Sequence, residues 1–320
     1  MVLCIGEILA DLIGSTARDG AVVYTRHAGG APFNVACGVK AVDGACGFIG
    51  RVGDDLTGKF LRAFAREKHF EFLNIETDPS HNTTLAFVEI DAGGERSFCF
   101  ARKQTADYLI EDDFESSLSR ADIVHIGSLM LSEPQGRTVC ERAFAAAAQQ
   151  GKKISFDVNF RDDLFGYTDA AREMFLNYVR RADIVKVSEE ELVFLCGAAE
   201  CARGEHWYAR YLRKLCDKAD KVVALTLGAR GCAVCFREKV YLIEAQKITP
   251  VDTTGAGDAF YAAFLAGLDR RGFTAENVVR SARLANVAAG YTTLQYGAIA
   301  ILPPLAQMEL LAETLPFSQI

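Results

Sequence analysis

Short apolar runs of strand-like composition alternate along the chain with longer segments of helical periodicity. The apolar runs cover residues 2–6, 46–50, 123–127, 154–157, 184–187 and 222–227. The helical segments between and after them cover residues 33–42, 56–68, 136–150, 170–181 and 207–216. Strands that are apolar on both faces are typical of a parallel sheet covered by helices on both sides. The alternation therefore predicts a three-layer α/β/α fold with a mostly parallel central sheet.

One stretch interrupts this alternation with the pattern of a β-hairpin. Two β-type segments, 84–90 and 95–100, flank the loop Asp91-Ala92-Gly93-Gly94, whose glycines suit a tight connection. Segment 21–26 is also β-type, and we expect it to pair with the hairpin in a small second sheet over one end of the main domain. The alternative is a peripheral hairpin without function.

The small sheet is expected to act as a lid on a single domain. The lid would consist of about residues 12–30 and 82–104, inserted in a domain that spans residues 1–320. The sequence contains no long repeat, low-complexity tract or linker that would divide it further. Beyond residue 253 the pattern is mainly helical, over 256–271, 275–291 and 305–315.

The composition excludes several classes of protein. The chain has 320 residues, of which 50% are hydrophobic and 24% are charged, as in ordinary globular domains. Its formal net charge of −7 argues against a nucleic-acid-binding protein, which would carry a basic face. A local cluster of backbone amides could still bind an anion on such an acidic protein.

The sequence shows no pattern of export or of membrane insertion. The first apolar stretch lacks a basic region and contains Glu7 and Asp11, unlike a signal peptide. The uncharged apolar run 259–268 is far too short to span a bilayer. The chain has ten cysteines, and Cys232 and Cys235 lie three apart in a strand-like stretch, where they would point to opposite faces. We therefore expect a cytoplasmic protein with buried, reduced thiols.

The segment Asp252-Thr253-Thr254-Gly255-Ala256-Gly257-Asp258 carries the most chemical information, and an apolar helix follows it. The first amides of a helix lack helical partners and lie at the positive end of its dipole, so they suit a phosphate group. Asp258 would hold a carboxylate beside these amides, where it could accept the proton of an attacking alcohol. The alternative is a glycine-rich turn with an acidic residue that stabilises the helix start.

The string from Asp252 through Leu265 resembles the C-terminal signature of the PfkB carbohydrate kinase, or ribokinase-like, family. The resemblance implies a ribokinase-like fold and an ATP-dependent sugar kinase that requires Mg²⁺. It also implies that Asp258 is the catalytic base, and that Gly255, Ala256 and Gly257 form the anion hole.

The family's N-terminal signature has a counterpart in Gly29-Gly30-Ala31-Pro32-Phe33-Asn34-Val35-Ala36, with Gly53 at the expected spacing. Asp43 stands where the family usually has Gly or Ser, which indicates a local change of turn. The resemblance implies that Gly29, Gly30 and Asn34 bind the sugar, together with Asp11 after the first strand. A turn followed by a helix with Pro32 near its start would produce the same pattern.

Two arginines are further candidates for substrate binding. Arg161 lies in Asp157-Val158-Asn159-Phe160-Arg161, just after a buried strand, and α/β folds bind ligands at the carboxyl ends of their strands. The family has a similar string whose arginine faces substrate or phosphate. Arg102 ends the expected lid hairpin. A surface arginine is the alternative interpretation of both.

The segment Ser188-Glu189-Glu190-Glu191 has the spacing of a helix capping box. The family carries an N-x-x-E motif here, and the resemblance implies that Glu191 acts on Mg²⁺ through water, with Ser188 replacing the usual Asn. The remaining positions that the resemblance assigns to the nucleotide are Thr226, Gly228, Gly231 and Asn286. Relatives often bind a monovalent cation such as K⁺ beside the anion hole, and Asp252 and Thr254 are the candidate ligands.

Two other nucleotide motifs can be dismissed. Residues 53–60 almost match a Walker A loop, but Phe60 stands where Ser or Thr would bind Mg²⁺. No G-x-G-x-x-G string follows the first strand, so a dinucleotide-binding fold has no local support.

The choice of substrate stays open at this point. The G-G-A-P-x-N-V-A form of the first signature most resembles fructokinases, which phosphorylate a primary hydroxyl of a ketose. A 2-keto-3-deoxygluconate kinase is the alternative, since Arg102 and Arg161 together could pair with a carboxylate. A non-catalytic sugar- or nucleotide-binding regulator is an alternative from another class. Similar proteins commonly form homodimers through the lid.

Overall fold

The computed structural model describes residues 1–320 except 18, 91–95, 198–203 and 205. In this described part, a ten-stranded sheet has the order β14-β13-β12-β11-β10-β9-β8-β1-β4-β5. Its strands, in chain order, are β1 (Val2–Ile5), β4 (Cys46–Gly53), β5 (Phe72–Asp78), β8 (Ile123–Ile126), β9 (Lys153–Asp157), β10 (Ile184–Ser188), β11 (Val222–Thr226), β12 (Cys232–Phe236), β13 (Lys239–Ile243) and β14 (Phe317–Gln319).

Most of this sheet is parallel, as the alternation of the sequence predicts. Strands from β5 to β11 pair in parallel, whereas β12, β13 and β14 add an antiparallel edge. Three strands escape the sequence interpretation: β5, β13 and β14. The sequence of β5, FLNIETD, mixes apolar and polar residues because this strand lies at the edge of the sheet and is mostly half-buried.

Helices cover both faces of the large sheet and divide the core into two layers. One layer contains α1 (Ala31–Ala41), α2 (Leu56–Arg66), α9 (Ala256–Arg271), α10 (Ala275–Thr292) and α11 (Leu305–Thr314). The other contains α3 (Glu115–Leu118), α4 (Pro134–Gln149), α6 (Asp169–Arg181), α7 (Glu189–Cys196) and α8 (Tyr208–Leu215). A short helix, α5 (Asp162–Phe165), follows β9.

Neighbouring strand residues face opposite layers, as the two-residue period of a strand requires. Val2 and Cys4 of β1 belong to the first layer, while Leu3 and Ile5 belong to the second. The expectation for the two cysteines of β12 is confirmed, because Cys232 packs in the first layer and Cys235 in the second.

Helix α9 has the bounds expected from the sequence and forms the centre of the first layer. All residues from Ala259 to Leu268 are buried. This burial explains why the sequence has no charged residue in this run. Its neighbours in the fold are α1 and α10. Among the described residues, we find no helix whose length and apolar character would let it cross a membrane.

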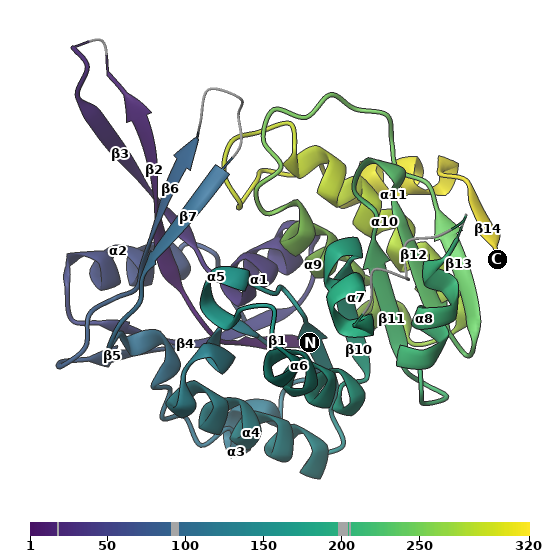
Figure 1. Ribbon diagram of the computed structural model, residues 1–320, viewed down its shortest axis with the longest axis horizontal. Helices are drawn as coiled ribbons and strands as arrows, with labels where there is room; N and C mark the ends of the chain where they lie inside the picture. The colour runs from purple at the N-terminus through teal and green to yellow at the C-terminus, as the bar shows by residue number, and fades with distance from the viewer. Residues whose placement is uncertain (18, 91–95, 198–203, 205) are drawn as a thin grey trace.

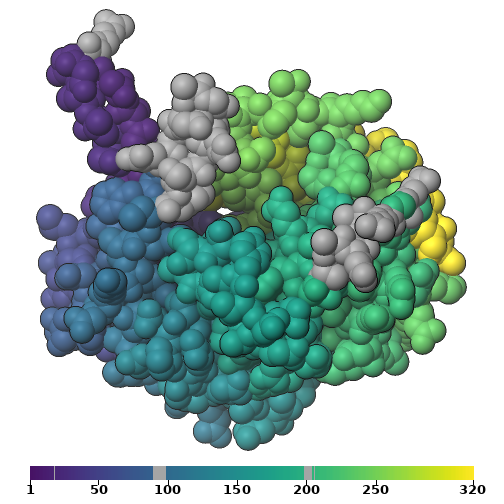
Figure 2. Space-filling view, viewed as in Figure 1, coloured from purple at the N-terminus to yellow at the C-terminus, as the bar shows by residue number. Residues whose placement is uncertain are grey.

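A second, four-stranded sheet projects from the main body (Figures 1 and 2). Its order is β3-β2-β6-β7, formed by β2 (Leu9–Thr16), β3 (Val22–Gly29), β6 (Leu85–Ile90) and β7 (Arg96–Ala101). The sequence predicts the hairpin β6–β7, but it places the 21–26 segment directly beside that hairpin. In the structure β2 lies between them, pairing antiparallel with β3 and parallel with β6. The expected loop over residues 91–94 lies outside the described residues.

A buried ion pair joins the base of this small sheet to the main domain. Arg102 directly follows β7 and is 4% exposed. Its Nε and Nη2 atoms lie 2.9 and 2.8 Å from Oδ2 of Asp107. The other oxygen of Asp107 accepts hydrogen bonds from the hydroxyls of Thr84 and Thr105, at 2.6 and 2.8 Å. Since Thr84 directly precedes β6, one carboxylate holds both ends of the hairpin.

We therefore expect Asp107→Asn to destabilise the protein strongly. The substitution leaves the Arg102 cation buried without a counter-charge, which typically costs about 3 kcal/mol. The matched control is Asp220→Asn, which breaks an exposed ion pair with Arg237 and should cost less than about 1 kcal/mol. Urea unfolding of the three proteins measures both values. Equal losses in the two variants would contradict a special role for the Asp107 pair.

Candidate active site

The start of α9 forms a cradle of backbone amides. Gly255 is the N-cap with φ of 73°, and a Cβ atom there would lie only 2.5 Å from the Cα of Ala298. Both the left-handed backbone and the close approach therefore require glycine. Within the described chain, the amides of Gly255, Gly257 and Asp258 donate to no other residue, whereas the Ala256 amide donates to the carbonyl of Thr253 at 3.2 Å.

This arrangement differs in one respect from the expected anion hole. The sequence assigned Gly255, Ala256 and Gly257 to it, but the bond from Ala256 engages that amide within the turn. The amide of Asp258, which the sequence did not assign to the anion hole, has no protein partner among the described residues. A helix start with unengaged amides is a favourable site for a phosphate group.

Asp258 lies half-buried at the wall of a cavity of about 330 Å³. The side-chain amide of Asn34, on α1, donates a hydrogen bond of 2.8 Å to its Oδ2. Burial raises the pKa of Asp258 to about 6, although the bond from Asn34 opposes the shift. The negative charge of Asp157 raises this pKa further, while Lys186 and Arg161 lower it. A carboxylate with a pKa near 6 is ionised at neutral pH and is a better base than an ordinary aspartate.

The same cavity collects most of the residues that the sequence predicts for the sugar. Asp11, Gly30, Asn34 and Arg161 line it. The Oδ1 atom of Asn34 is buried and has no hydrogen-bond partner among the described residues, so it can accept a bond from a ligand hydroxyl.

The two glycines of the first signature have different roles in the fold. Gly29 itself is not part of the cavity lining, but a side chain there would overlap with the carboxylate of Asp11. Gly30 has φ of 105°, and a Cβ would lie 2.5 Å from the carbonyl oxygen of Glu7. Gly29 thus makes room for Asp11, and Gly30 lets the chain turn tightly into α1.

Arg102 does not reach the cavity, in contrast to the expectation from the sequence. Its guanidinium group is buried against Asp107 at the base of the small sheet. The residue lies just beyond the end of β7, where the chain already turns into the main domain. Phe100, two residues earlier on β7, lines the cavity instead.

A second cavity, of about 270 Å³, adjoins the first at the carboxyl ends of β9 and β10. Asn159 and Arg161 line both cavities, so they form the boundary between them. Ser188 and Glu191 also line the second cavity. The structure thus brings Arg161, Ser188 and Glu191 together at neighbouring strand ends, where α/β folds bind ligands.

Lys186 is a residue of this second cavity that the sequence interpretation missed. It is 6% exposed, and its Nζ lies 2.7 and 2.8 Å from the two carboxylate oxygens of Asp157. Burial alone would lower its pKa, but the carboxylates of Asp157 and Glu191 reverse the effect and raise it, so the side chain stays cationic. A lysine inside the otherwise apolar run of residues 184–187 was the signal, because lysine is almost never buried without a partner.

Glu7 is a second residue that the sequence interpretation did not assign to the site. It lines the sugar-side cavity and is 1% exposed. Burial raises its pKa to about 8, against the nearby charge of Arg102, so the side chain is mostly protonated at neutral pH. Its position in the apolar stretch before Asp11 was the available signal.

The interpretation of Ser188 and Glu191 as a capping box is correct in the structure. The Glu191 amide donates to the Ser188 hydroxyl at 3.2 Å, and the Ser188 amide donates to Oε2 of Glu191 at 2.7 Å. The other oxygen of Glu191 accepts from the amide of Phe160 at 2.9 Å. The carboxylate is therefore fixed in orientation at the cavity wall, where its remaining lone pairs can bind water.

A third cavity, of about 480 Å³, completes the site on the far side of the cradle. The predicted nucleotide residues Thr226, Gly228, Gly231 and Asn286 all line it. Asn286 is buried rather than exposed on its helix, and its Nδ2 donates to the carbonyls of Ile243 and Glu244, at 3.2 Å each. Gly257 and Thr226 are shared with the second cavity, so the three cavities meet around the start of α9.

The two candidate cation ligands lie just before this helix. One oxygen of Asp252 accepts from the amide of Thr254 and the other from the amide of Gly297, both at 2.8 Å. The carboxylate thus ties the turn before α9 to the loop at Gly297. No group of three or more His, Cys, Asp or Glu residues with the arrangement of a metal site occurs among the residues that the structure describes.

We predict that Asn34→Ala raises the pKa of Asp258 above its value of about 6. The substitution removes the hydrogen bond that favours the ionised carboxylate but leaves the burial that disfavours it. Asn74→Ala is the matched control, because the Asn74 amide bonds Asp112 on another part of the surface. Carboxyl carbon NMR titration of the aspartates measures the pKa in each protein. An unchanged pKa in Asn34→Ala would show that the bond does not control this group.

Comparison with known proteins gives relatives along the whole chain. Residues 1–305 match the family described as pfkB family carbohydrate kinase. Fructokinase-1 of Zea mays is 35% identical over 321 residues, which cover 98% of each protein. The fructokinase of Vibrio alginolyticus is 34% identical over 308 residues, which cover 96% of each.

Solved structures confirm the fold. The fructokinase from Vibrio cholerae O395, in its fructose, ADP and calcium ion bound form, aligns with a TM-score of 0.83 and 29% identity over 97% of each chain. The fructokinase with bound ATP from Xylella fastidiosa aligns with a TM-score of 0.85 and 27% identity over 98% of each. The resemblance inferred from the two signatures is confirmed, and the fold is ribokinase-like. The chain belongs to the pfkB family of carbohydrate kinases, phosphotransferases with an alcohol group as acceptor.

Proposed function

We propose that this protein is an ATP-dependent fructokinase that transfers the γ-phosphoryl group to a primary hydroxyl of fructose. The observation that carries the proposal is the position of Asp258, at the point where the sugar-side cavity meets a helix start with unengaged amides. The relatives that are named fructokinases, at 34–35% identity over nearly the full length, support the choice of sugar.

Asp258 is the proposed general base. Its carboxylate accepts the proton of the sugar hydroxyl while the hydroxyl oxygen attacks the γ-phosphorus, and the bond from that phosphorus to the bridging oxygen of ADP breaks. Asn34 orients the carboxylate through the 2.8 Å bond and offers its Oδ1 to a neighbouring hydroxyl. Asp11 and Gly30 complete the proposed sugar contacts from the other side of the cavity.

Positive groups converge where the transferred phosphoryl group would lie. The amides of Gly255, Gly257 and Asp258 point from the helix start, and Arg161 bounds the cavity. A Cβ on Gly257 would lie 3.5 Å from Nζ of Lys186, so this cation is within reach of the same group. Preorganised donors of this kind stabilise the charge that develops in phosphoryl transfer.

The residues present also fit the ions that such a reaction needs. Mg²⁺ bound to the nucleotide neutralises phosphate charge and usually keeps several waters. Glu191, with a fixed carboxylate at the wall of the second cavity, is proposed to hold one of these waters. We also propose Asp252 and Thr254 as ligands of a monovalent cation, in line with a Vibrio cholerae fructokinase variant crystallised in a potassium ion bound form.

The structure favours fructose over an acid sugar. The alternative, 2-keto-3-deoxygluconate, rested on the possibility that Arg102 and Arg161 together pair with a carboxylate. Arg102 is instead neutralised by Asp107 outside the lining. Of the two arginines, Arg161 lines the described cavity and Arg102 does not. The carboxylate of Asp11 shares that cavity, which makes a second negative group unfavourable there.

The exposed side of the small sheet supports a further proposal, that the protein forms a homodimer through this sheet. Val22, Val23 and Tyr24 are 63, 48 and 41% exposed on its edge strand β3. An unpaired strand edge with apolar side chains is a ready surface for association. The cytoplasmic location stays a prediction.

We expect Asp258→Asn to lower kcat by about 10³-fold, because a positioned general base contributes rate factors of this order. The affinity for ATP should be retained, since the nucleotide residues lie in a separate cavity. Asp220→Asn, on an exposed ion pair, is the matched control and should keep full activity. Steady-state kinetics and calorimetric ATP titration provide the measurements. Normal turnover of Asp258→Asn would refute the assignment of the base.

A panel of sugars in an assay that couples ADP formation to NADH oxidation tests the substrate. We expect fructose to give the highest kcat/KM, at least about 10²-fold above 2-keto-3-deoxygluconate, since loss of one charged contact costs about 3 kcal/mol. A preference for the acid sugar would contradict the argument from Arg102. Sugar binding without ADP formation across the whole panel would favour the non-catalytic regulator.

A further inference from the structure

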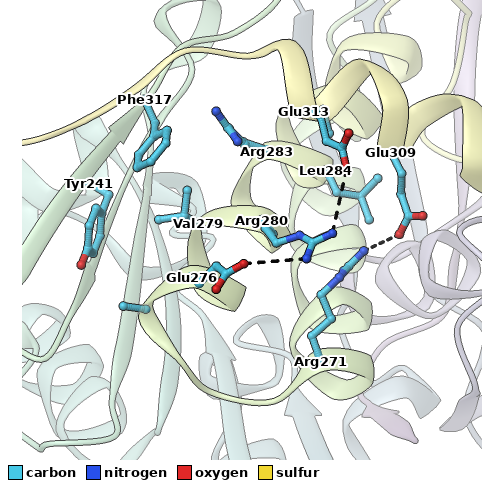
Figure 3. Close-up of a pocket in the computed structure, with 12 residues that line it drawn as sticks. Tyr241, Arg271, Glu276, Val279, Arg280, Arg283, Leu284, Glu309, Glu313 and Phe317 are labelled. Carbon is cyan, nitrogen blue, oxygen red and sulfur yellow. Dashed lines mark hydrogen bonds and ion pairs between the residues drawn. The ribbon is translucent and has the colours of Figure 1, made fainter.

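A separate pocket lies at the opposite end of α9 from Asp258. It has a volume of about 420 Å³ and is formed by α10, α11, strand β13 and the start of β14 (Figure 3). Arg271, in the last turn of α9, closes one side. The volume lies within the range of small-molecule sites. No residue of the three cavities described above lines it.

The walls of this pocket combine apolar side chains with opposite charges. Tyr241, Val279, Leu284 and Phe317 provide apolar surface. The ionised side chains are Arg271, Arg280, Arg283, Glu276, Glu309 and Glu313. Together they would bind a ligand that has both an apolar body and a charged group.

Each carboxylate of the pocket already has an arginine neighbour other than Arg283. Figure 3 shows Arg280 between Glu276 and Glu313, at 3.9 and 4.0 Å. Glu309 contacts Arg271, and Arg270 lies 3.8 Å from the same carboxylate. The lining itself has three guanidinium groups and three carboxylates, and Arg283 is in no ion pair with a carboxylate among the described residues.

Two of these guanidinium groups have N–H donors without a partner in the described part of the chain. The Nε of Arg283 and the Nη1 of Arg271 are buried and have no hydrogen-bond partner among the described residues. The guanidinium group of Arg283 lies over the ring of Phe317, with Cζ 4.6 Å from the centroid. Burial lowers the pKa of Arg271; Glu309 opposes the shift, while Arg270 and Arg280 add to it. Buried donors without partners cost free energy that a suitable acceptor recovers.

We propose that this pocket binds a small organic anion, with its phosphate or carboxylate group on Arg271 and Arg283 and its apolar part against Val279, Leu284 and Tyr241. Guanidinium groups bind both kinds of anion through paired hydrogen bonds. The site goes beyond the proposed kinase reaction, because it shares no residue with the cavities that would hold fructose and ATP.

Helix α10 contributes residues to both this pocket and the nucleotide cavity. Arg283 lies one helical turn before Asn286, which lines the nucleotide cavity. Tyr241 belongs to β13, whose last residue, Ile243, accepts a hydrogen bond from Asn286. An anion on Arg283 thus contacts the two elements that hold Asn286 in place.

Isothermal titration calorimetry with simple aromatic anions tests the proposal. The full chain is first saturated with a non-hydrolysable ATP analogue, so that the amide cradle of α9 is occupied. Phenyl phosphate and benzoate are the two probes, and benzyl alcohol is the neutral probe of the same shape. We expect at least one anion to bind at least about 10-fold more tightly than the alcohol. Comparison of the two anions shows whether phosphate or carboxylate is preferred.

Substitutions then locate the binding site. Arg283→Gln should lower the affinity for the preferred anion by about 10-fold. Arg271→Gln provides a second, independent variant should the first fail to fold. Arg66→Gln, an exposed arginine in the last turn of α2, is the matched control and should bind as the wild type does. Thermal unfolding and affinity for the ATP analogue confirm that each variant is intact. The proposal is overturned if no anion binds, if the alcohol binds equally well, or if folded Arg283→Gln and Arg271→Gln bind as tightly as Arg66→Gln.

Discussion

The whole site depends on the burial of one helix. From Ala259 to Leu268, α9 is enclosed between α1, α10 and the central sheet, so its axis and its first residue are fixed by core packing. The first amides of α9 are therefore held in fixed positions although they have no protein partner among the described residues. In the absence of a ligand, only water can accept their hydrogen bonds. Asn34 comes from α1, the helix packed beside α9, and therefore meets Asp258 in a constant geometry.

Several charged side chains are buried around this helix start, where opposite charges pair with one another. Lys186 and Asp157 come from neighbouring parallel strands, β10 and β9, and are paired directly in the register of the sheet. Glu191 adds a further carboxylate whose charge is held by two backbone amides. Such a network is expensive to form in a nonpolar interior, and here it places the Lys186 cation beside Gly257 of the amide cradle.

Much of this could be predicted from the sequence because local chemistry and fold agree there. The bounds of α9 follow from Gly255 and the apolar run after Asp258, and the strand ends predicted the neighbourhood of Arg161. Lys186 could not be assigned, since a sequence does not show which carboxylate neutralises a buried lysine. Arg102 was placed with the ligand because its partner Asp107 is recognisable only once the lid base has folded. The edge strands β5 and β14 were missed because partly or fully exposed strands lack a uniform apolar pattern.

Asp11 joins the sugar-side cavity to the small sheet through a single strand. This residue lines the cavity from β2, and Gly29 of β3 leaves room for its carboxylate. Asn34 and Asp258, by contrast, reach the same cavity from helices α1 and α9 of the main domain. The wall of the cavity is therefore shared between the small sheet and the main domain, and any displacement of β2 relative to α9 would change the distance between the carboxylates of Asp11 and Asp258.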